Sequence, residues 1–399
     1  MGLALDMSRG KPSPAQLDLS NGLYQTLEAG FQSAGGVDTR NYGELAGIAE
    51  MKQIFAGMLG LDSGDILAGG NSSLNLMFDV ISRAMSHGLP DSPCPWNRCE
   101  KVKFLCPAPG YDRHFAVTEY FGAEMINVPM TDDGPDMDVV EAMVKSDPAV
   151  KGIWCVPVYS NPTGAVYSDE TVRRLAAMPC AAPDFLIMWD NAYTVHHLYD
   201  EIPRQANILE ACRGTGNPNR VILFASTSKI TFSGAGVACL AADKAMMKMQ
   251  VDALSLQTIG YNKVNQLAHA RFLGSFDGVN ALMKRHAAIL RPKFQLVDEV
   301  LTENLGGLDI ASWTRPRGGY FISLMAPKQT AARVVQLCAE ANVKLTPAGA
   351  AYPYGRDPED RNIRIAPTFP SEEELRTATQ LLTVCVRIAA LEGILNPEQ

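Results

Sequence analysis

The chain has 399 residues, 47% of them hydrophobic, with 35 Lys plus Arg against 43 Asp plus Glu and a formal net charge of −8. A chain of this length exceeds what one hydrophobic core usually supports, so two packed units are expected. The acidic balance opposes partners such as nucleic acid or an acidic membrane surface. Nine cysteines, an odd number without paired C-x-x-C spacing, predict reduced thiols and a cytoplasmic location, and we predict no metal site.

The N-terminal region carries no strong hydrophobic periodicity. Residues 1–42 are therefore predicted to form an arm that packs on the smaller unit or on a second subunit. The segment lacks the basic start and long apolar run of an export signal. No apolar stretch elsewhere reaches the roughly 18 to 20 residues of a membrane span, so no membrane association is expected.

Short apolar runs alternate with helix-length segments from residue 102 onward. The runs are rich in β-branched or aromatic residues and are bounded by Pro, Gly or Asn, as buried strands are. They cover residues 102–107, 124–129, 151–159, 185–190, 221–226 and 237–242. Between them, 137–146 and 168–178 are predicted to be helices. This alternation predicts an α/β fold with a mostly parallel sheet covered on both faces, an α/β/α arrangement.

The C-terminal part predicts long helices followed by a smaller α+β unit. Residues 243–304 contain few turn formers and are expected to be helical. The small unit is expected to contain strands at 318–325, 343–346 and 362–367 and helices at 331–342 and from about 371. We therefore divide the chain into an arm with part of the small domain (1–42), a large domain (43–300) and a small C-terminal domain (301–399).

Polar residues follow three of the predicted parallel strands. "YSNPTG" at 159–164 follows the first strand, "WDNAY" at 189–193 closes the second, and "STSK" at 226–229 closes the third. Each cluster alone is explained equally well by a turn, a helix cap or a solvated lysine. Because ligands of open α/β sheets bind outside the carboxyl ends of the strands, the three together predict one shared site.

Pyridoxal 5'-phosphate explains why these residue types occur together. A lysine amine forms a Schiff base with the aldehyde of this cofactor, a carboxylate keeps its pyridine nitrogen protonated, and hydroxyl groups bind its phosphate. Lys229 is therefore the expected Schiff-base lysine, and Ser226 and Ser228 are the expected phosphate ligands. Thr227 lies between the two serines and should point the other way.

In these motifs the chain resembles class I aminotransferases of fold type I, and in particular the aspartate aminotransferase subgroup 1c. The similar segments are "RGKPS", "RNYGELAG", "PGYDRHF", "GIWCVPVYSNPTG", "WDNAYTVHH", "STSKITFSGAG" and "LTPAGAAYPYG", which together span nearly the whole chain. The resemblance implies a homodimer with shared active sites that acts on amino acids and keto acids. It further implies transamination between L-aspartate and 2-oxoglutarate by a ping-pong mechanism.

The resemblance also implies roles around the cofactor. Asn161 and Tyr193 would hydrogen-bond its phenolic oxygen, and Asp190 would pair with the pyridinium nitrogen. Asn71 and Ser72, in "GGNSSL" at 69–74, would bind the phosphate where a helix begins. Lys229, Asp190 and Tyr193 are thus the predicted catalytic residues.

Four further residues match positions beside the cofactor or the substrate. Tyr111 would stack on the pyridine ring, and His114 would orient the carboxylate that pairs with the pyridinium. Tyr42 would reach the phosphate of the neighbouring subunit. Arg364, in "NIRIAP", would clamp the substrate α-carboxylate, together with Asn161.

Two points of the site stay open at this stage. A substrate with a second carboxylate needs a second cation, for which Lys263 in "TIGYNKVNQ" is the choice. Arg9, Lys11 and Arg113 are the alternatives. Common class I enzymes carry a phosphate-binding arginine eight residues after the lysine, where this chain has Val237, so phosphate binding is left to hydroxyls, backbone amides and a helix dipole, with Ser233 as an extra candidate donor.

Other classes of function fit less well. A nicotinamide dehydrogenase would want G-x-G-x-x-G, but "GTGNPN" at 214–219 lacks the last glycine and precedes a strand. A transcription regulator with an aminotransferase-like domain needs a winged helix, for which the sequence has no room before Tyr42. An aminotransferase for another amino acid, or a lyase using the same cofactor, stays open, as do the exact substrate pair, the pathway and assembly beyond a dimer.

Overall fold

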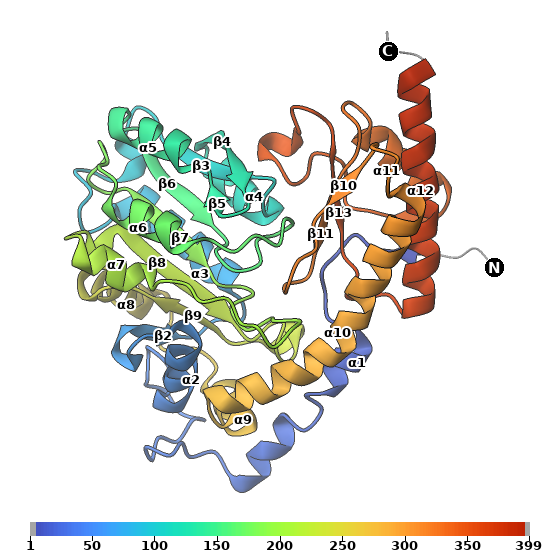
Figure 1. Cartoon of the computed structure of the whole chain (residues 1–399). Coiled ribbons are helices and arrows are strands. Elements are labelled where there is room, and N and C mark those ends of the chain that lie inside the picture. The colour runs from blue at the N-terminus through green and yellow to red at the C-terminus, as the bar shows by residue number, and fades with distance from the viewer. Residues whose placement is uncertain (1–4, 396–399) are drawn as a thin grey trace.

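A computed structural model describes residues 5–395 of the chain, in which a long helix connects a large sheet to a small one (Figure 1). The large sheet has eight strands in the order β2-β9-β8-β7-β6-β3-β4-β5. The strands are β2 Ile66–Ala68, β3 Lys103–Ala108, β4 Glu124–Thr131, β5 Gly134–Pro135, β6 Val150–Cys155, β7 Leu186–Asp190, β8 Val221–Ser226 and β9 Ala238–Ala241. The five strands from β8 to β4 in this order run parallel, and β2, β9 and β5 pair antiparallel. The predicted mostly parallel sheet is confirmed.

Both faces of the large sheet are buried, as its alternating side chains show. On β7, Ile187 and Trp189 belong to one apolar cluster, while Leu186 and Met188 belong to another on the opposite face. The helices of this unit are α2 Ala49–Leu59, α3 Ser73–His87, α4 Asp112–Tyr120, α5 Met137–Ser146, α6 Asp169–Ala177, α7 Ile208–Gly214, α8 Lys244–Gln257 and α9 Lys263–Leu273. Burial on both faces explains why the strands are continuous apolar runs in the sequence.

The long helix α10, Phe276–Leu305, leads from the large sheet into the second unit (Figure 1). That unit holds the antiparallel sheet β10-β11-β13, the parallel pair β1-β12 and two helices. Its elements are β1 Leu5–Asp6, β10 Ser312–Trp313, β11 Ile322–Met325, α11 Ala331–Glu340, β12 Val343–Lys344, β13 Asn362–Ile365 and α12 Glu372–Leu395. The predicted domain boundary at residue 300 falls inside α10, and the division into three parts stays a prediction.

The N-terminal arm packs on both units of the same chain. Strand β1 pairs with β12, and the short helix α1, Pro14–Asp18, contacts α10. The 3₁₀ segment Tyr24–Ala29 lies against α9 of the large unit. Of the two predicted positions of the arm, packing on the smaller unit is therefore observed for the first residues of the arm.

Several strands are shorter than the sequence predicts, two of them most clearly. The run 151–159 leaves the sheet after Cys155, and Tyr159, further along the run, has a φ of 54°, outside the strand region. The run 318–325 enters its sheet only at Ile322. Before it, Gly318 lies so close to Tyr159 that a Cβ would fall 2.2 Å from the tyrosine ring, so this glycine permits a close contact between the two units.

Helix α12 is long and apolar enough, by length and composition, to cross a membrane, with a mean hydropathy of 1.5. The prediction that no apolar stretch is long enough to span a membrane is therefore wrong as far as length and composition are concerned. Its buried residues, among them Leu375, Leu382 and Val386, pack in the core of the small unit against α10 and α11. The core thus explains the buried apolar residues of α12, whereas Val384, Ile388, Leu391 and Ile394 of the same helix are exposed.

Candidate active site

The three polar clusters predicted to meet do lie at one edge of the large sheet. Strands β6, β7 and β8 are adjacent and parallel, so the loops that follow them leave the sheet on the same side. These loops carry Asn161, the segment 190–193 and Lys229. Arg364, on β13 of the small unit, reaches the same place, where its Nη1 lies 3.5 Å from Asn161 Oδ1. The site therefore lies between the two units.

Asp190, the last residue of β7, is a buried carboxylate with only one oxygen engaged. His114 Nε2 donates to Asp190 Oδ2 at 3.1 Å, and the imidazole stacks on Trp154 with ring centroids 4.3 Å apart. Asp190 Oδ1 is buried and has no hydrogen-bond partner among the residues that the structure describes. A buried carboxylate oxygen without a donor is costly, so this atom faces a position where a donor from outside the chain is expected.

Lys229 lies in the turn that follows β8, between two tyrosine rings. Its Nζ is 4.9 Å from the centroid of Tyr193 and 5.9 Å from that of Tyr320. Burial lowers the pKa of Lys229 below the ordinary lysine value, and the charge of Asp190 opposes this shift only in part. A lowered pKa favours the neutral amine, which is the nucleophilic form.

The hydroxyl groups around Lys229 divide between two faces of its turn. Thr227 Oγ1 accepts a hydrogen bond from the backbone of Val237 at 2.9 Å, so it points away from the site, as predicted. Ser228 Oγ is buried and lacks a partner within residues 5–395. Ser233 Oγ, an extra candidate donor, instead donates to the Ser228 carbonyl at 2.7 Å. Ser226, half-buried, lies at the end of β8.

The loop before α3 lies against this turn. A Cβ on Gly236 would fall 2.7 Å from Ser228 Oγ and 2.8 Å from the carbonyl oxygen of Asn71, so the two segments are in close contact. Ser72 is the N-cap of α3 and makes no side-chain hydrogen bond to the first-turn amides. The free amides of a 15-residue helix and its dipole therefore lie beside the serine hydroxyls, which is an arrangement suited to a phosphate.

Tyr111 and Tyr193 are both held in the protonated form. Burial raises the pKa of Tyr111 to about 12, with a smaller contribution from the charge of Asp190. Burial also raises the pKa of Tyr193 well above its ordinary value. Tyr111 is the N-cap of α4, and its ring meets His114 edge-on at a centroid distance of 4.9 Å.

Two predicted residues do not join this cluster within one chain. Tyr42 is 77% exposed on a loop, where it is free to contact another molecule. Lys263, the first residue of α9, is only 5% exposed, and no carboxylate pairs with it in the described part of the chain. Both assigned roles stay predictions.

Comparison with known proteins identifies the family. A family model described as aspartate amino-transferase matches residues 1–397. The chain belongs to the aspartate aminotransferase family. This aminotransferase is 51% identical over 395 residues to the aspartate aminotransferase of Corynebacterium glutamicum, covering 99% of this chain and 91% of the relative.

Solved structures agree with this assignment. The crystal structure of an aspartate transaminase from Corynebacterium glutamicum superimposes on this aminotransferase with a TM-score of 0.96 at 51% identity, covering 98% of this chain and 92% of that one. An α-aminoadipate aminotransferase of Thermus thermophilus, at 20% identity, shares the fold with a TM-score of 0.79, over 97% of this chain and 93% of that one. The predicted fold type I and the predicted aminotransferase activity are confirmed.

A buried hydrogen-bond network beneath the lysine of this aminotransferase escaped the sequence analysis. Gln16 Nε2 donates to Tyr320 Oη at 3.0 Å and to His286 Nδ1 at 3.1 Å. Burial lowers the pKa of His286 to about 4, so the ring is neutral and its Nε2–H donates to the Ile230 carbonyl at 3.0 Å. Tyr320 Oη is 3.5 Å from the Lys229 carbonyl. The arm thus supports the backbone that carries Lys229.

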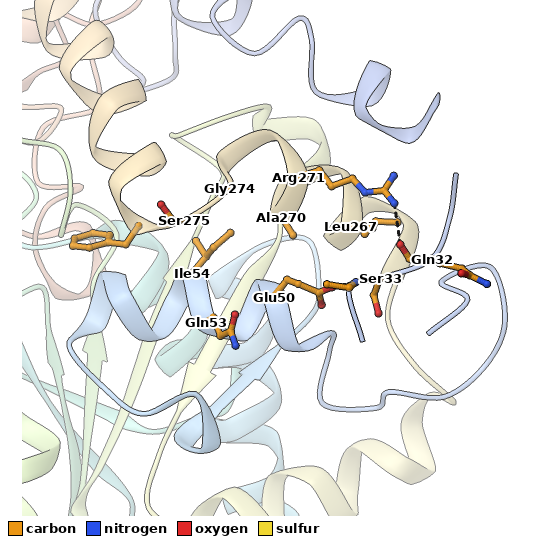
Figure 2. Close-up of a pocket in the computed structure, with 12 residues that line it drawn as sticks. Gln32, Ser33, Glu50, Gln53, Ile54, Leu267, Ala270, Arg271, Gly274 and Ser275 are labelled. Atoms are coloured by element: carbon orange, nitrogen blue, oxygen red, sulfur yellow. Dashed lines mark hydrogen bonds between the residues drawn. The ribbon is translucent and has the colours of Figure 1, made fainter. Parts of the chain in front are cut away.

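A separate cavity of about 390 Å³ lies between α2, α9 and residues 32–34 of the arm (Figure 2). Arg271 lines it and donates to the carbonyl oxygens of Thr26, Gly30 and Gln32 at 3.0, 2.6 and 2.9 Å. Among the described residues, none of those predicted for the active site lines this cavity. Arg271 therefore ties the arm to α9, away from the candidate active site.

We predict that Gln16→Leu destabilises the protein by about 1 to 3 kcal/mol, because it leaves His286 Nδ1 and Tyr320 Oη buried without a donor. Urea unfolding of the two proteins measures the difference. The exposed Gln25, changed to Leu in the same way, is the control and should have little effect. Equal unfolding midpoints for Gln16→Leu and the wild type would show that the network contributes nothing to stability.

Proposed function

We propose that this aminotransferase binds pyridoxal 5'-phosphate and transfers the amino group of L-aspartate to 2-oxoglutarate by ping-pong kinetics. The unpartnered, buried oxygen of Asp190 next to Lys229 carries the proposal. A protonated pyridine nitrogen is a donor that would satisfy this oxygen, and a phosphate would accept from the unpartnered hydroxyl of Ser228. The donor set of the site therefore fits this cofactor.

Each residue then has a chemical task. When bound, pyridoxal phosphate supplies an aldehyde that condenses with amines and a ring that withdraws electrons. The neutral amine of Lys229 would hold the cofactor and then move the proton at the substrate Cα, while Asp190 keeps the ring nitrogen charged. Asn161 and the protonated Tyr193 would donate to the phenolic oxygen. Tyr111 would cover one face of the ring.

The phosphate would be held without the arginine that common class I enzymes use. The phosphate would lie at the start of α3, whose free amides supply a partial positive charge. Its side-chain ligands would be Ser226, Ser228, Asn71 and Ser72. Val237 is buried and its backbone amide is already bonded to Thr227, so no cation stands at that position. In this proposal, hydroxyl groups and the N-terminus of the helix bind the phosphate in place of a charged side chain.

The substrate proposal rests on the relatives and on the arginine of the small unit. The 51%-identical relative is an aspartate aminotransferase. Arg364 is a buried guanidinium at the site, suited to an α-carboxylate. For the second carboxylate we propose Arg9 in place of the predicted Lys263, because Arg9 is exposed and its neighbour Gly10 packs on Phe321, the ring that lies 5.0 Å under Arg364.

We further propose that the protein is a cytoplasmic homodimer. All nine cysteines are free, as expected in a reducing compartment. Tyr42, Leu256 and Ile259 expose 77, 90 and 65% of their surface. The backbone of Gly43 approaches that of Gly260 closely, so the loops of Tyr42 and Ile259 adjoin, and Leu256 lies in the last turn of α8 just before the second loop. An exposed apolar patch of this kind supports an interface between subunits, with Tyr42 reaching the phosphate of the partner's site.

The first test of this function is the cofactor link. Borohydride reduction of the loaded enzyme, followed by peptide mass mapping, should place the cofactor on Lys229, and Lys229→Ala should show neither the adduct nor turnover. Asp190→Ala should retain the adduct but lose about 10²- to 10³-fold in kcat. The exposed Asp200, changed to Ala, is the control. An adduct on another lysine, or an Asp190→Ala loss below about tenfold, would contradict the assignment.

The second test separates the two candidate cations. Arg9→Ala should lower kcat/KM for aspartate roughly 30-fold, since the distal carboxylate loses its partner, and leave alanine almost unchanged. Lys263→Ala should affect the two substrates equally, because this lysine is buried in the fold. A selective loss of aspartate in Lys263→Ala, with none in Arg9→Ala, would return the role to Lys263.

The third test asks whether Tyr42 serves the partner's site. Lys229→Ala and Tyr42→Ala subunits, each inactive or impaired alone, are unfolded together, refolded and assayed. If Tyr42 acts across the interface, each hybrid dimer contains one intact site, and activity rises to about half that of the wild type per hybrid. No gain over the separately refolded parents would show that Tyr42 does not act across the interface.

A further inference from the structure

Arg364 is already paired with a carboxylate of the chain itself. Arg364 Nη1 lies 3.1 Å from Asp112 Oδ1, and the two side chains are 8% and 36% exposed. Asp112 is the first residue of α4 in the large unit, whereas Arg364 stands on β13 of the small unit. The cation proposed to receive the substrate therefore has an internal anion within hydrogen-bond distance.

Both terminal nitrogens of this guanidinium have further partners within the chain. Nη1 faces Asn161 Oδ1 as well, at 3.5 Å, and Nη2 donates to Thr346 Oγ1 at 3.2 Å. Nε is buried and has no partner among the described residues. A carboxylate that binds bidentately needs two adjacent N–H groups. A carboxylate that binds Nη1 and Nη2 together must therefore take an Nη1 hydrogen from Asp112 or from Asn161.

Of the two partners of Arg364 Nη1, Asp112 is the one that can give up its hydrogen bond. Asn161 is only 3% exposed and is committed to the predicted cofactor site, whereas the Asp112 side chain is 36% exposed. Asp112 also stands in the first turn of a helix, where the dipole stabilises its negative charge after it leaves Arg364. Rotation of this one side chain into water frees the fork of the guanidinium.

We propose that Asp112 is an internal competitor for the substrate carboxylate. It neutralises the buried Arg364 while the site is free of substrate, and an amino acid or keto acid displaces it on binding. The inference rests on the proposed function of Arg364 and adds a residue that sets affinity for both substrates alike. If the internal pair is populated about nine-tenths of the time, the apparent Kd rises about tenfold.

The test is the binding of succinate, an unreactive dicarboxylate, to the cofactor-loaded enzyme by calorimetry. Asp112→Asn keeps the shape of the side chain and removes its charge, so succinate should bind about tenfold more tightly. In the same variant, the KM for aspartate and for 2-oxoglutarate should fall with kcat unchanged. Glu119→Gln removes an equal charge from an exposed position of the same helix and should leave the Kd unchanged.

Arg364→Leu distinguishes this proposal from the one it rests on. Loss of succinate binding in Arg364→Leu, with no further effect of Asp112→Asn in that background, supports both. If Arg364→Leu loses binding but Asp112→Asn binds succinate as the wild type does, or more weakly, the competitor role is overturned and that of Arg364 stands. If Arg364→Leu binds succinate normally, the carboxylate site lies elsewhere and both are overturned.

Discussion

The site depends on one buried carboxylate that is only half satisfied. Asp190 ends a central strand of the sheet, its Oδ2 accepts from His114, and its Oδ1 is left without a donor. Such a group is unfavourable in a protein interior unless a donor arrives from outside. The surroundings of Asp190 keep it in place: His114 stacks on Trp154, whose indole nitrogen donates to Thr118 at 2.8 Å. A protonated nitrogen that donates to Asp190 Oδ1 would therefore bind favourably at this position.

The sheet explains why this carboxylate, the lysine and the amide of Asn161 meet. Parallel strands end on one side, and burial on both faces gives each strand many packing contacts that fix where it ends. The second unit adds Arg364 from β13, and the arm adds Gln16 from below. The site is thus assembled from segments far apart in the chain, which is why its residues depend on the packing of both units.

Sequence reasoning predicted the parts of this structure that follow from local pattern and parallel topology. Helix α5 has the predicted bounds, 137–146, because its apolar positions recur at the helical period between two strands. That Asn161, Asp190 and Lys229 lie at one edge of the sheet followed from the strand order alone. What the sequence does not record is a contact between distant polar side chains. Gln16 and His286 lie 270 residues apart, and Asp112 and Arg364 lie 252 apart. The burial of Lys263 is a tertiary effect of the same kind.

We propose that Asp190 holds a positive charge on the ring nitrogen of a bound cofactor. The ¹⁵N chemical shift of ¹⁵N-labelled pyridoxal phosphate bound to the protein measures the protonation of that nitrogen directly. Because the carboxylate is buried and oriented by His114, we expect a protonated ring nitrogen in the wild type at neutral pH. A neutral ring nitrogen under the same conditions would show that Asp190 does not have this role.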